Sequence, residues 1–252
     1  MSSSDRPRPL ARAAGRLAGA PLAALVVAVA PVTGGAALLP PSAAAQGAVR
    51  GELSLVQRPG ADAADLRDAV VWLESRERGA SAVGGAPRDG TIGMRDREFR
   101  PHVLTVAAGG AVGFPNEDPF SHNVFSNADP GPFDLGLYRR GATRTATFPR
   151  AGVYPIYCNI HSKMVSFVIA VPTPWVARAD AAGRFAIERV PAGAYVLHAW
   201  HERAGAELTR ELDVPAAGSA SIQVALDARA YVAAPHLNKF GRPYALMRAD
   251  RY

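Results

Sequence analysis

The chain has 252 residues, of which 48% are apolar and 20% are charged, and its formal net charge at pH 7 is +6. This is enough apolar material for one large domain or two small ones, and the basic residues form no dense stripe with interleaved aromatics, so we expect no nucleic-acid partner. The 24 glycines and 21 prolines are spread along the chain, which favours many short strands over long helices.

Residues 1–45 are predicted to be an export signal peptide. Four arginines between Arg6 and Arg16 precede an apolar run from Leu22 to Ala30, and Ala43–Ala45 offers a small-residue cleavage site. A retained membrane anchor is the alternative, but the apolar run is short for a membrane span and is followed at once by Pro31. We therefore expect a periplasmic or secreted protein without stable membrane insertion after cleavage.

From residue 46 to residue 172, short alternating or apolar runs follow one another at regular spacing and are separated by turn residues. The predicted strands are 48–56, 69–73, 94–99, 103–106, 111–114, 133–138, 142–148, 153–157 and 165–171. This succession predicts an all-β sandwich domain over residues 46–172. A second series of strands over residues 173–227 predicts a smaller, separate β-sandwich. Residues 228–252 form a basic tail without periodicity, which we expect to lie along the surface or to be partly disordered.

The only cysteine of the chain, Cys158, stands in the pattern Cys158-x-x-His161-x-x-Met164 between two predicted strands. An exported protein usually pairs its cysteines, and this one has no partner within the chain, which favours a functional thiol. A thiolate, an imidazole and a thioether on one short loop favour copper, and a mononuclear copper site needs a second imidazole. His122, at the end of an upstream strand, is the predicted supplier. The expected metal ligands are therefore His122, Cys158, His161 and Met164.

Other uses of these residues are less well supported. A structural zinc site requires a thiolate, imidazole or carboxylate as its fourth ligand, and methionine is a poor substitute for these. A dinuclear copper site needs two cysteines, and a Cys–His nucleophile would want an orienting residue and an oxyanion pocket, of which the sequence gives no sign. We expect Glu117 and Asp118 to be solvated.

The remaining histidines are expected to have no part in the metal site. His102 is predicted to be structural. His198 and His201 point to opposite faces if they share a strand, so they cannot form a simple chelate. His236 lies in the tail, and we assign it no role.

The segment Ser121–Val124 resembles the first-ligand motif of the cupredoxins, the plastocyanin and pseudoazurin group, and Phe114–Asp118 resembles the strand and loop before it. The Cys-x-x-His-x-x-Met spacing is similar to the ligand loop of amicyanin. The resemblance covers roughly residues 103–171 and implies a Greek-key β-sandwich that holds one type 1 copper ion. The sequence departs from the family pattern at Ile160, where amicyanin and plastocyanin have proline. Ile160 keeps a backbone N–H that can donate to the sulfur of Cys158 and so tune the reduction potential.

The second series of strands, over residues 175–226, resembles the carboxypeptidase-regulatory-like β-sandwich. Its turn motifs Asp180–Phe185 and Val190–Tyr195 carry this likeness. Domains of that kind usually act as structural or adhesion modules.

The cupredoxin resemblance implies a one-electron carrier rather than an enzyme, with redox partner proteins as its partners. In that reading His161 is the ligand nearest solvent, and the side chain of Asn123 is expected to hold the ligand loop through hydrogen bonds to its backbone. Two alternatives remain open: a copper-binding or copper-delivery protein of the cell envelope, and a structural envelope module with no redox role.

Overall fold

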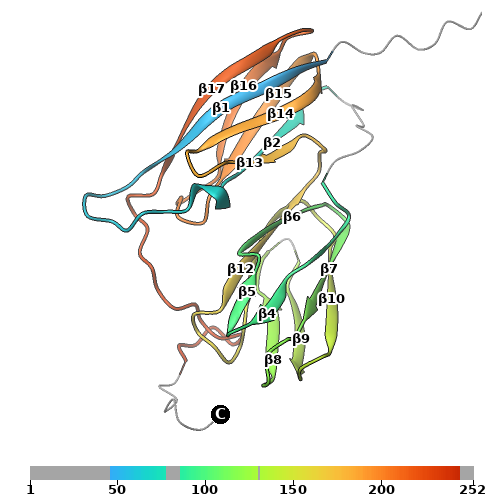
Figure 1. The fold of residues 1–252 in the computed structure, drawn as a ribbon, viewed down its shortest axis with the longest axis vertical. Coiled ribbons are helices and arrows are strands. Elements are labelled where there is room, and N and C mark those ends of the chain that lie inside the picture. The colour runs from blue at the N-terminus through green and yellow to red at the C-terminus, as the bar shows by residue number, and fades with distance from the viewer. Residues whose placement is uncertain (1–45, 78–85, 130, 245–252) are drawn as a thin grey trace, which may run out of the picture. The chain divides into compact units, whose positions relative to one another are not determined.

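The computed structural model describes residues 46–77, 86–129 and 131–244, so the predicted signal peptide lies outside the described residues. The regular secondary structure of the described residues is almost entirely β-strand, which confirms the all-β prediction (Figure 1). A 3-10 turn, η1 (Leu66–Asp68), begins at Asp65, whose carboxylate accepts the backbone N–H of Arg67 at 3.0 Å. Over the same residues, no helix has both the length and the apolar character needed to cross a membrane.

Two sheets built from residues 89–171 form the first sandwich. One sheet has the order β10-β7-β3, from β3 (Asp89–Thr91), β7 (Gly110–Pro115) and β10 (Thr143–Phe148). The other has the order β6-β12-β11-β8-β9, from β6 (Val103–Ala107), β8 (His122–Ser126), β9 (Phe133–Tyr138), β11 (Gly152–Tyr157) and β12 (Val165–Val171). Alternate residues of both sheets meet in one core, for example Phe114 and Phe148 from the first sheet and Tyr154 from the second.

A hairpin of β4 (Gly93–Arg95) and β5 (Glu98–Arg100) replaces the single strand expected over residues 94–99. Its two turn residues, Asp96 and Arg97, have φ values of 57° and 62°. Positive φ at both positions is the type I′ geometry that suits the twist of a hairpin. The carboxylate of Asp118 accepts the backbone N–H of Asp96 at 2.7 Å and that of Arg97 at 3.0 Å, which holds this turn without a glycine.

The second sandwich is built from both ends of the described chain. One sheet has the order β14-β1-β17, from β1 (Gln46–Val56), β14 (Arg184–Pro191) and β17 (Ser219–Asp227). The other has the order β13-β2-β15-β16, from β2 (Val70–Ser75), β13 (Val176–Arg178), β15 (Gly193–Trp200) and β16 (Leu208–Val214). Val49, Leu73, Leu197 and Val224 are buried between these two sheets.

The strand pairing differs from the expected division at residue 172. β1 pairs antiparallel with β14 and parallel with β17, and β2 pairs antiparallel with β13 and β15. The segment 46–75, which we expected in the first sandwich, therefore completes the second. Hydrophobic alternation predicts that a segment is a strand with one buried face, and it does not specify which sheet the strand joins.

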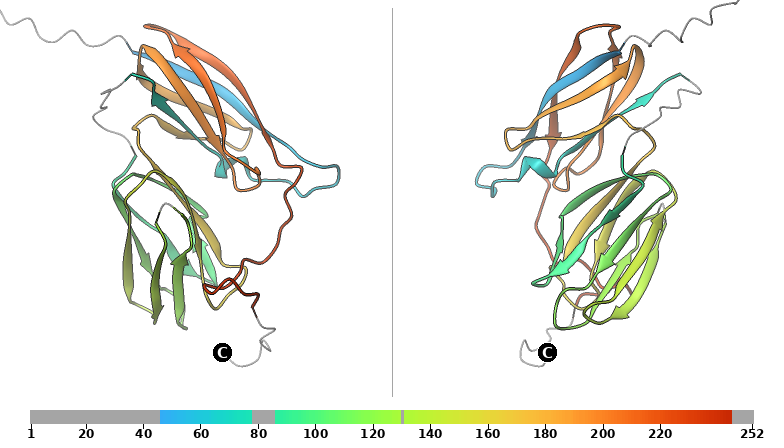
Figure 2. Two further views of the ribbon diagram at one scale, coloured as in Figure 1. Left: turned by 180° about the vertical axis from the view of Figure 1, so that it is seen from behind. Right: turned by 45° about the vertical axis from the view of Figure 1, so that its right-hand side comes forward.

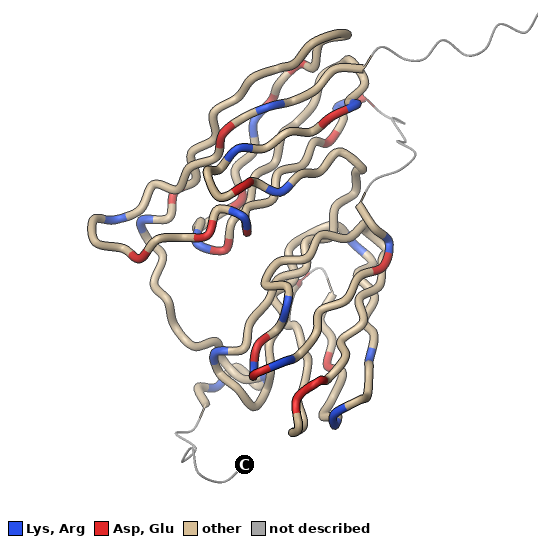
Figure 3. The backbone as a smooth tube through the Cα atoms, viewed as in Figure 1, with Lys and Arg blue, Asp and Glu red and all other residues tan. Residues whose placement is uncertain are grey.

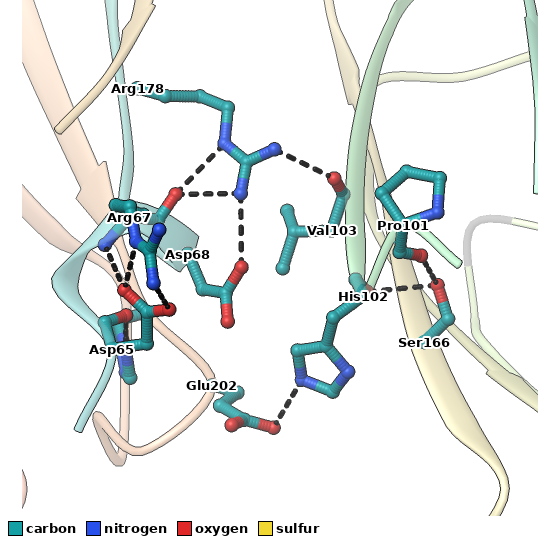
Figure 4. A network of polar contacts seen from close by, with 10 residues as sticks. Asp65, Arg67, Asp68, Pro101, His102, Val103, Ser166, Arg178 and Glu202 are labelled. Carbon is teal, nitrogen blue, oxygen red and sulfur yellow. Dashed lines mark hydrogen bonds and ion pairs between the residues drawn. The ribbon is translucent and has the colours of Figure 1, made fainter. Parts of the chain in front are cut away.

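A third apolar cluster joins residues of both sandwiches. Trp72 of β2 and Trp200 of β15 pack with Ile169 and Val171 of β12. Beside this cluster, polar side chains form a network (Figure 4): the imidazole of His102 lies 3.0 Å from the carboxylate of Glu202. The guanidinium of Arg178 in the same network donates to the carbonyl oxygen of Val103 and to the carboxylate of Asp68, at 3.1 and 2.9 Å.

Lysine, arginine, aspartate and glutamate are interspersed along both sandwiches (Figure 3). Many of them are paired on the surface, such as Arg95 with Glu117 and Arg76 with Glu211. The basic residues are therefore scattered over the structure, as they are along the sequence.

Candidate metal centre

The ligand loop, residues 158–164, connects β11 to β12. Tyr157 and Val165 are paired in the last register position of these two strands, which fixes both ends of the loop. Within the loop the N–H of Cys158 donates to the carbonyl oxygen of Met164 at 3.3 Å. The N–H of Met164 donates to the carbonyl oxygen of His161 at 3.1 Å. The backbone is thereby folded so that the first and last residues of the loop face each other.

Three of the four predicted ligands come together in the structure. The candidate donor atoms of His122, Cys158 and His161 all lie within 4.8 Å of one another. The sulfur of Cys158 is 3.7 Å from the Nδ1 atom of each imidazole. His122 and Cys158 are fully buried, whereas His161 is only half-buried. Met164 is 1% exposed and packs in the same core cluster as Cys158.

Asp118 orients the imidazole of His122. Its Oδ2 atom lies 2.7 Å from Nε2, so that nitrogen carries the proton and Nδ1 is left as the lone-pair donor facing the sulfur. The expectation that Asp118 is solvated is wrong, because its side chain is 5% exposed and accepts the two turn amides of the β4–β5 hairpin as well. These N–H donors together outweigh the effect of burial and lower the pKa of the carboxyl group.

Burial keeps both imidazoles neutral. It lowers the pKa of His161 to about 4, with a smaller contribution from the nearby His122. It also lowers the pKa of His122, although the hydrogen bond to Asp118 opposes this shift. Burial raises the pKa of the Cys158 thiol, opposed by the backbone N–H groups of Asn123, Ile160 and His161. Neutral imidazoles have free lone pairs, and a metal ion would displace the thiol proton on binding.

Phe120 covers the two histidines on one side. Its ring centroid is 5.2 Å from that of His122 and 5.8 Å from that of His161. The guanidinium of Arg97 lies over the ring of Phe120, 4.9 Å from its centroid. Neither residue belongs to a ligand pattern, so the sequence alone does not select them. Together these contacts place an aromatic ring and a guanidinium beside the two imidazoles.

Asn123 differs from its expected role. Its side-chain amide donates to the carboxylate of Asp134 at 2.6 Å, and its Oδ1 atom is buried without a hydrogen-bond partner. It reaches the ligand loop through its backbone N–H, which faces the sulfur of Cys158. The interaction with the loop is therefore made by the main chain of β8.

The structure keeps three other histidines away from this group. His102 contacts Glu202, and His198 lies 2.5 Å from the carboxylate of Glu207. His201 is buried, with its Nε2 atom 3.3 Å from the carbonyl oxygen of Asp65. His236, to which the sequence assigned no role, lies directly against the ligand loop.

The donor set fits copper, since two neutral imidazoles and a thiolate are the ligands of mononuclear electron-transfer sites. No protein-family model matches the chain. The curated plastocyanins of Ulva arasakii and Ulva pertusa are each 33% identical to it over 73 residues, which cover 25% of this chain and 74% of the relative. The chain belongs to the plastocyanin family. This match confirms the cupredoxin domain, which we equate with the first sandwich.

Parts of several solved structures are similar to parts of the chain. A purple cupredoxin from Nitrosopumilus maritimus is 23% identical and has a TM-score of 0.30, with 33% of this chain and 100% of that chain covered. A copper-containing nitrite reductase from Thermus scotoductus is 28% identical with a TM-score of 0.31, covering 39% of this chain and 25% of that chain. A mutant amicyanin is 20% identical with a TM-score of 0.31, covering 33% of this chain and 82% of that chain. At these TM-scores the family assignment rests on the plastocyanin match.

Proposed function

We propose that the chain is an exported type 1 copper protein that carries one electron at a time between redox partner proteins. The observation that carries this proposal is the buried group of His122, Cys158 and His161, in which the sulfur lies 3.7 Å from both Nδ1 atoms. Met164 would be the weak axial ligand, because its side chain is buried in the same core cluster as Cys158 and it ends the same loop. A copper ion bound there would supply a one-electron couple.

The residues around the ligands support this role. Asp118 fixes the ring of His122 in one orientation and tautomer, so this donor is in place before a metal arrives. Burial of Cys158 excludes water from the sulfur. His161 is the half-buried member of the group, and we assign its ring edge as the port through which electrons leave and enter. The chain has no substrate of its own in this scheme.

The proposed location is the periplasm or the extracellular space, on the basis of the signal-like residues 1–45. The second sandwich, with its carboxypeptidase-regulatory-like turn motifs, is proposed to be a structural module. In support, the carboxylate of Asp180 accepts the backbone N–H groups of Ala182 and Arg184, both at 2.9 Å, so these motif residues serve a turn.

The test is copper loading of the full chain, followed by visible absorption. We expect one equivalent of Cu(II) to produce the intense band of a copper–thiolate bond, which bleaches on reduction and returns on reoxidation with the metal retained. The matched control is Cys158→Ser, which should keep the far-UV circular dichroism and lose the band. Release of copper on reduction would favour a delivery protein. A wild-type chain that takes up no copper would instead favour the structural module.

A further inference from the structure

We propose that residues 228–244, the C-terminal strap, position the metal centre, with His236 and Tyr244 fixing the carbonyl groups of the ligand loop. The strap leaves the second sandwich after β17 and runs to the loop between β11 and β12 (Figure 2). This inference rests on the proposed function, because it assigns a role at the same copper site. The described part of the tail lies along the surface, as expected, since most of its residues are exposed, and it contacts the ligand loop in addition.

His236 makes three contacts with the ligand loop and the strand before it. Its backbone N–H donates to the carbonyl oxygen of Ser162 at 3.2 Å. Its Nε2 atom lies 3.2 Å from the carbonyl oxygen of His161. Its ring stacks on Tyr157, with centroids 4.4 Å apart and an interplanar angle of 23°. One residue of the strap therefore holds both the backbone of a proposed ligand and the strand that delivers Cys158.

Tyr244 holds the other proposed ligand of the loop. Its hydroxyl donates to the carbonyl oxygen of Cys158 at 2.6 Å. Its ring meets the ring of His236 edge-on, with centroids 5.3 Å apart. These two residues of the strap thus support each other, while each one contacts the backbone of a different ligand residue.

Lys239 ties the strap to both the loop and β9. Its backbone N–H donates to the side-chain oxygen of Asn159 at 2.9 Å. Its ammonium group lies 2.5 Å from the carboxylate of Asp134, the same carboxylate that accepts the amide of Asn123. Asn123 is the β8 residue whose N–H faces the sulfur of Cys158. Lys239 is therefore connected to the ligand residues in two ways, through Asn159 of the loop and through Asp134 to Asn123.

The strap is anchored where it leaves the second sandwich. The N–H of Ala228 donates to the carbonyl oxygen of Val56 at 2.9 Å, and the guanidinium of Arg203 lies 5.3 Å from the ring centroid of Tyr231. Because the strap is held at both ends, it has less conformational freedom than a free tail. It therefore loses less conformational entropy when it orders the ligand loop. The strap therefore holds the positions of Cys158 and His161 in the metal-free chain.

The test uses the full chain with two variants. Tyr244→Phe removes one hydroxyl, and His236→Phe keeps a ring against Tyr157 but removes both ring nitrogens, Nε2 beside His161 and Nδ1 beside Leu237. Val232→Ala is the matched control, since this strap side chain is 64% exposed. Two properties are measured: hydrogen–deuterium exchange of residues 158–164 in the metal-free protein, and the rate at which a chelator removes copper from the loaded protein. Loading with Cu(II) also gives the position of the copper–thiolate band.

We expect each phenylalanine variant to accelerate both loop exchange and copper loss by about fivefold, the effect of one net hydrogen bond, with the copper–thiolate band shifted. The double variant should exceed tenfold, and Val232→Ala should match the wild type. Phenylalanine variants that behave like Val232→Ala would overturn the proposal, and so would faster loop exchange without faster copper loss. If the wild type takes up no copper, the proposed function fails, and unchanged loop exchange in the variants would then overturn the strap separately.

Discussion

The buried carboxylate of Asp118 gives the sharpest test of how the metal centre is held. It accepts the N–H of Asp96 at 2.7 Å, the N–H of Arg97 at 3.0 Å and the Nε2 proton of His122 at 2.7 Å. In Asp118→Asn one of the two side-chain oxygens becomes an NH2 group, so at least one of these donors faces another donor. Loss of one bond to a buried charge, with weakening of the others, should destabilise the metal-free cupredoxin domain by about 3 kcal/mol.

The matched control is Glu117→Gln, the same change at the neighbouring residue. The carboxylate of Glu117 is 43% exposed and pairs with Arg95 on the surface, so its loss should cost less than about 1 kcal/mol. Urea unfolding of both variants, with hydrogen exchange of peptides from β8 and β11 to follow the cupredoxin domain, measures the difference. Equal stabilities for the two variants would refute the claim that Asp118 is the buried support of His122.

Three further predictions concern other parts of the chain. Ile160→Pro removes the N–H that faces the sulfur of Cys158 and should lower the reduction potential by about 40 mV, the one-electron equivalent of ~1 kcal/mol, whereas voltammetry of Ile160→Ala should show little change. The hydrogen bond to Glu202 raises the pKa of His102 above 6.5, so its stabilisation is present below pH 6.5 and lost as the pH rises through the folded-state pKa. The difference in unfolding free energy between wild type and His102→Gln should therefore shrink in alkaline buffer, and a difference that grows would contradict this sign. Deletion of residues 46–56 should abolish the cooperative unfolding of the second sandwich in tryptophan fluorescence, because β1 lies between β14 and β17, and a retained transition would speak against that pairing.

The proposed ligands could be selected from the sequence because most of their chemistry is local. Cys158, His161 and Met164 occupy one loop of seven residues, and a loop between two paired strands brings such residues close together whatever the rest of the fold does. His122 is 36 residues upstream of Cys158, yet it begins β8, which lies beside β11 in the same sheet. The need for a second imidazole selected that residue, the family resemblance supported it, and the strand order explains why it faces the sulfur.

The support of the ligands could not be selected in this way, because it depends on contacts between distant segments. Asp118 and Glu117 are adjacent carboxylates on one turn, and nothing local separates the buried one from the exposed one. The difference comes from the β4–β5 hairpin, whose turn residues Asp96 and Arg97 present two N–H donors to Asp118. Because Asp96-Arg97 lacks the glycine that usually indicates such a turn, the sequence reads as one continuous strand there.

Local reasoning also assigned β1 to the wrong sandwich and gave the C-terminal tail no contact with the ligand loop. β1 is a parallel neighbour of β17, and a parallel pairing across most of the chain leaves no trace in hydrophobic alternation. The strap that follows β17 has no periodicity, because its hydrogen bonds to the rest of the chain go to separate points, the end of β1 and the ligand loop, and not along one strand. Its first bond, from Ala228 to Val56, needs the end of β1 in place. The pairing of β1 therefore bears on the position of Cys158 as well as on the second sandwich, so deletion of residues 46–56 should also accelerate exchange in the ligand loop.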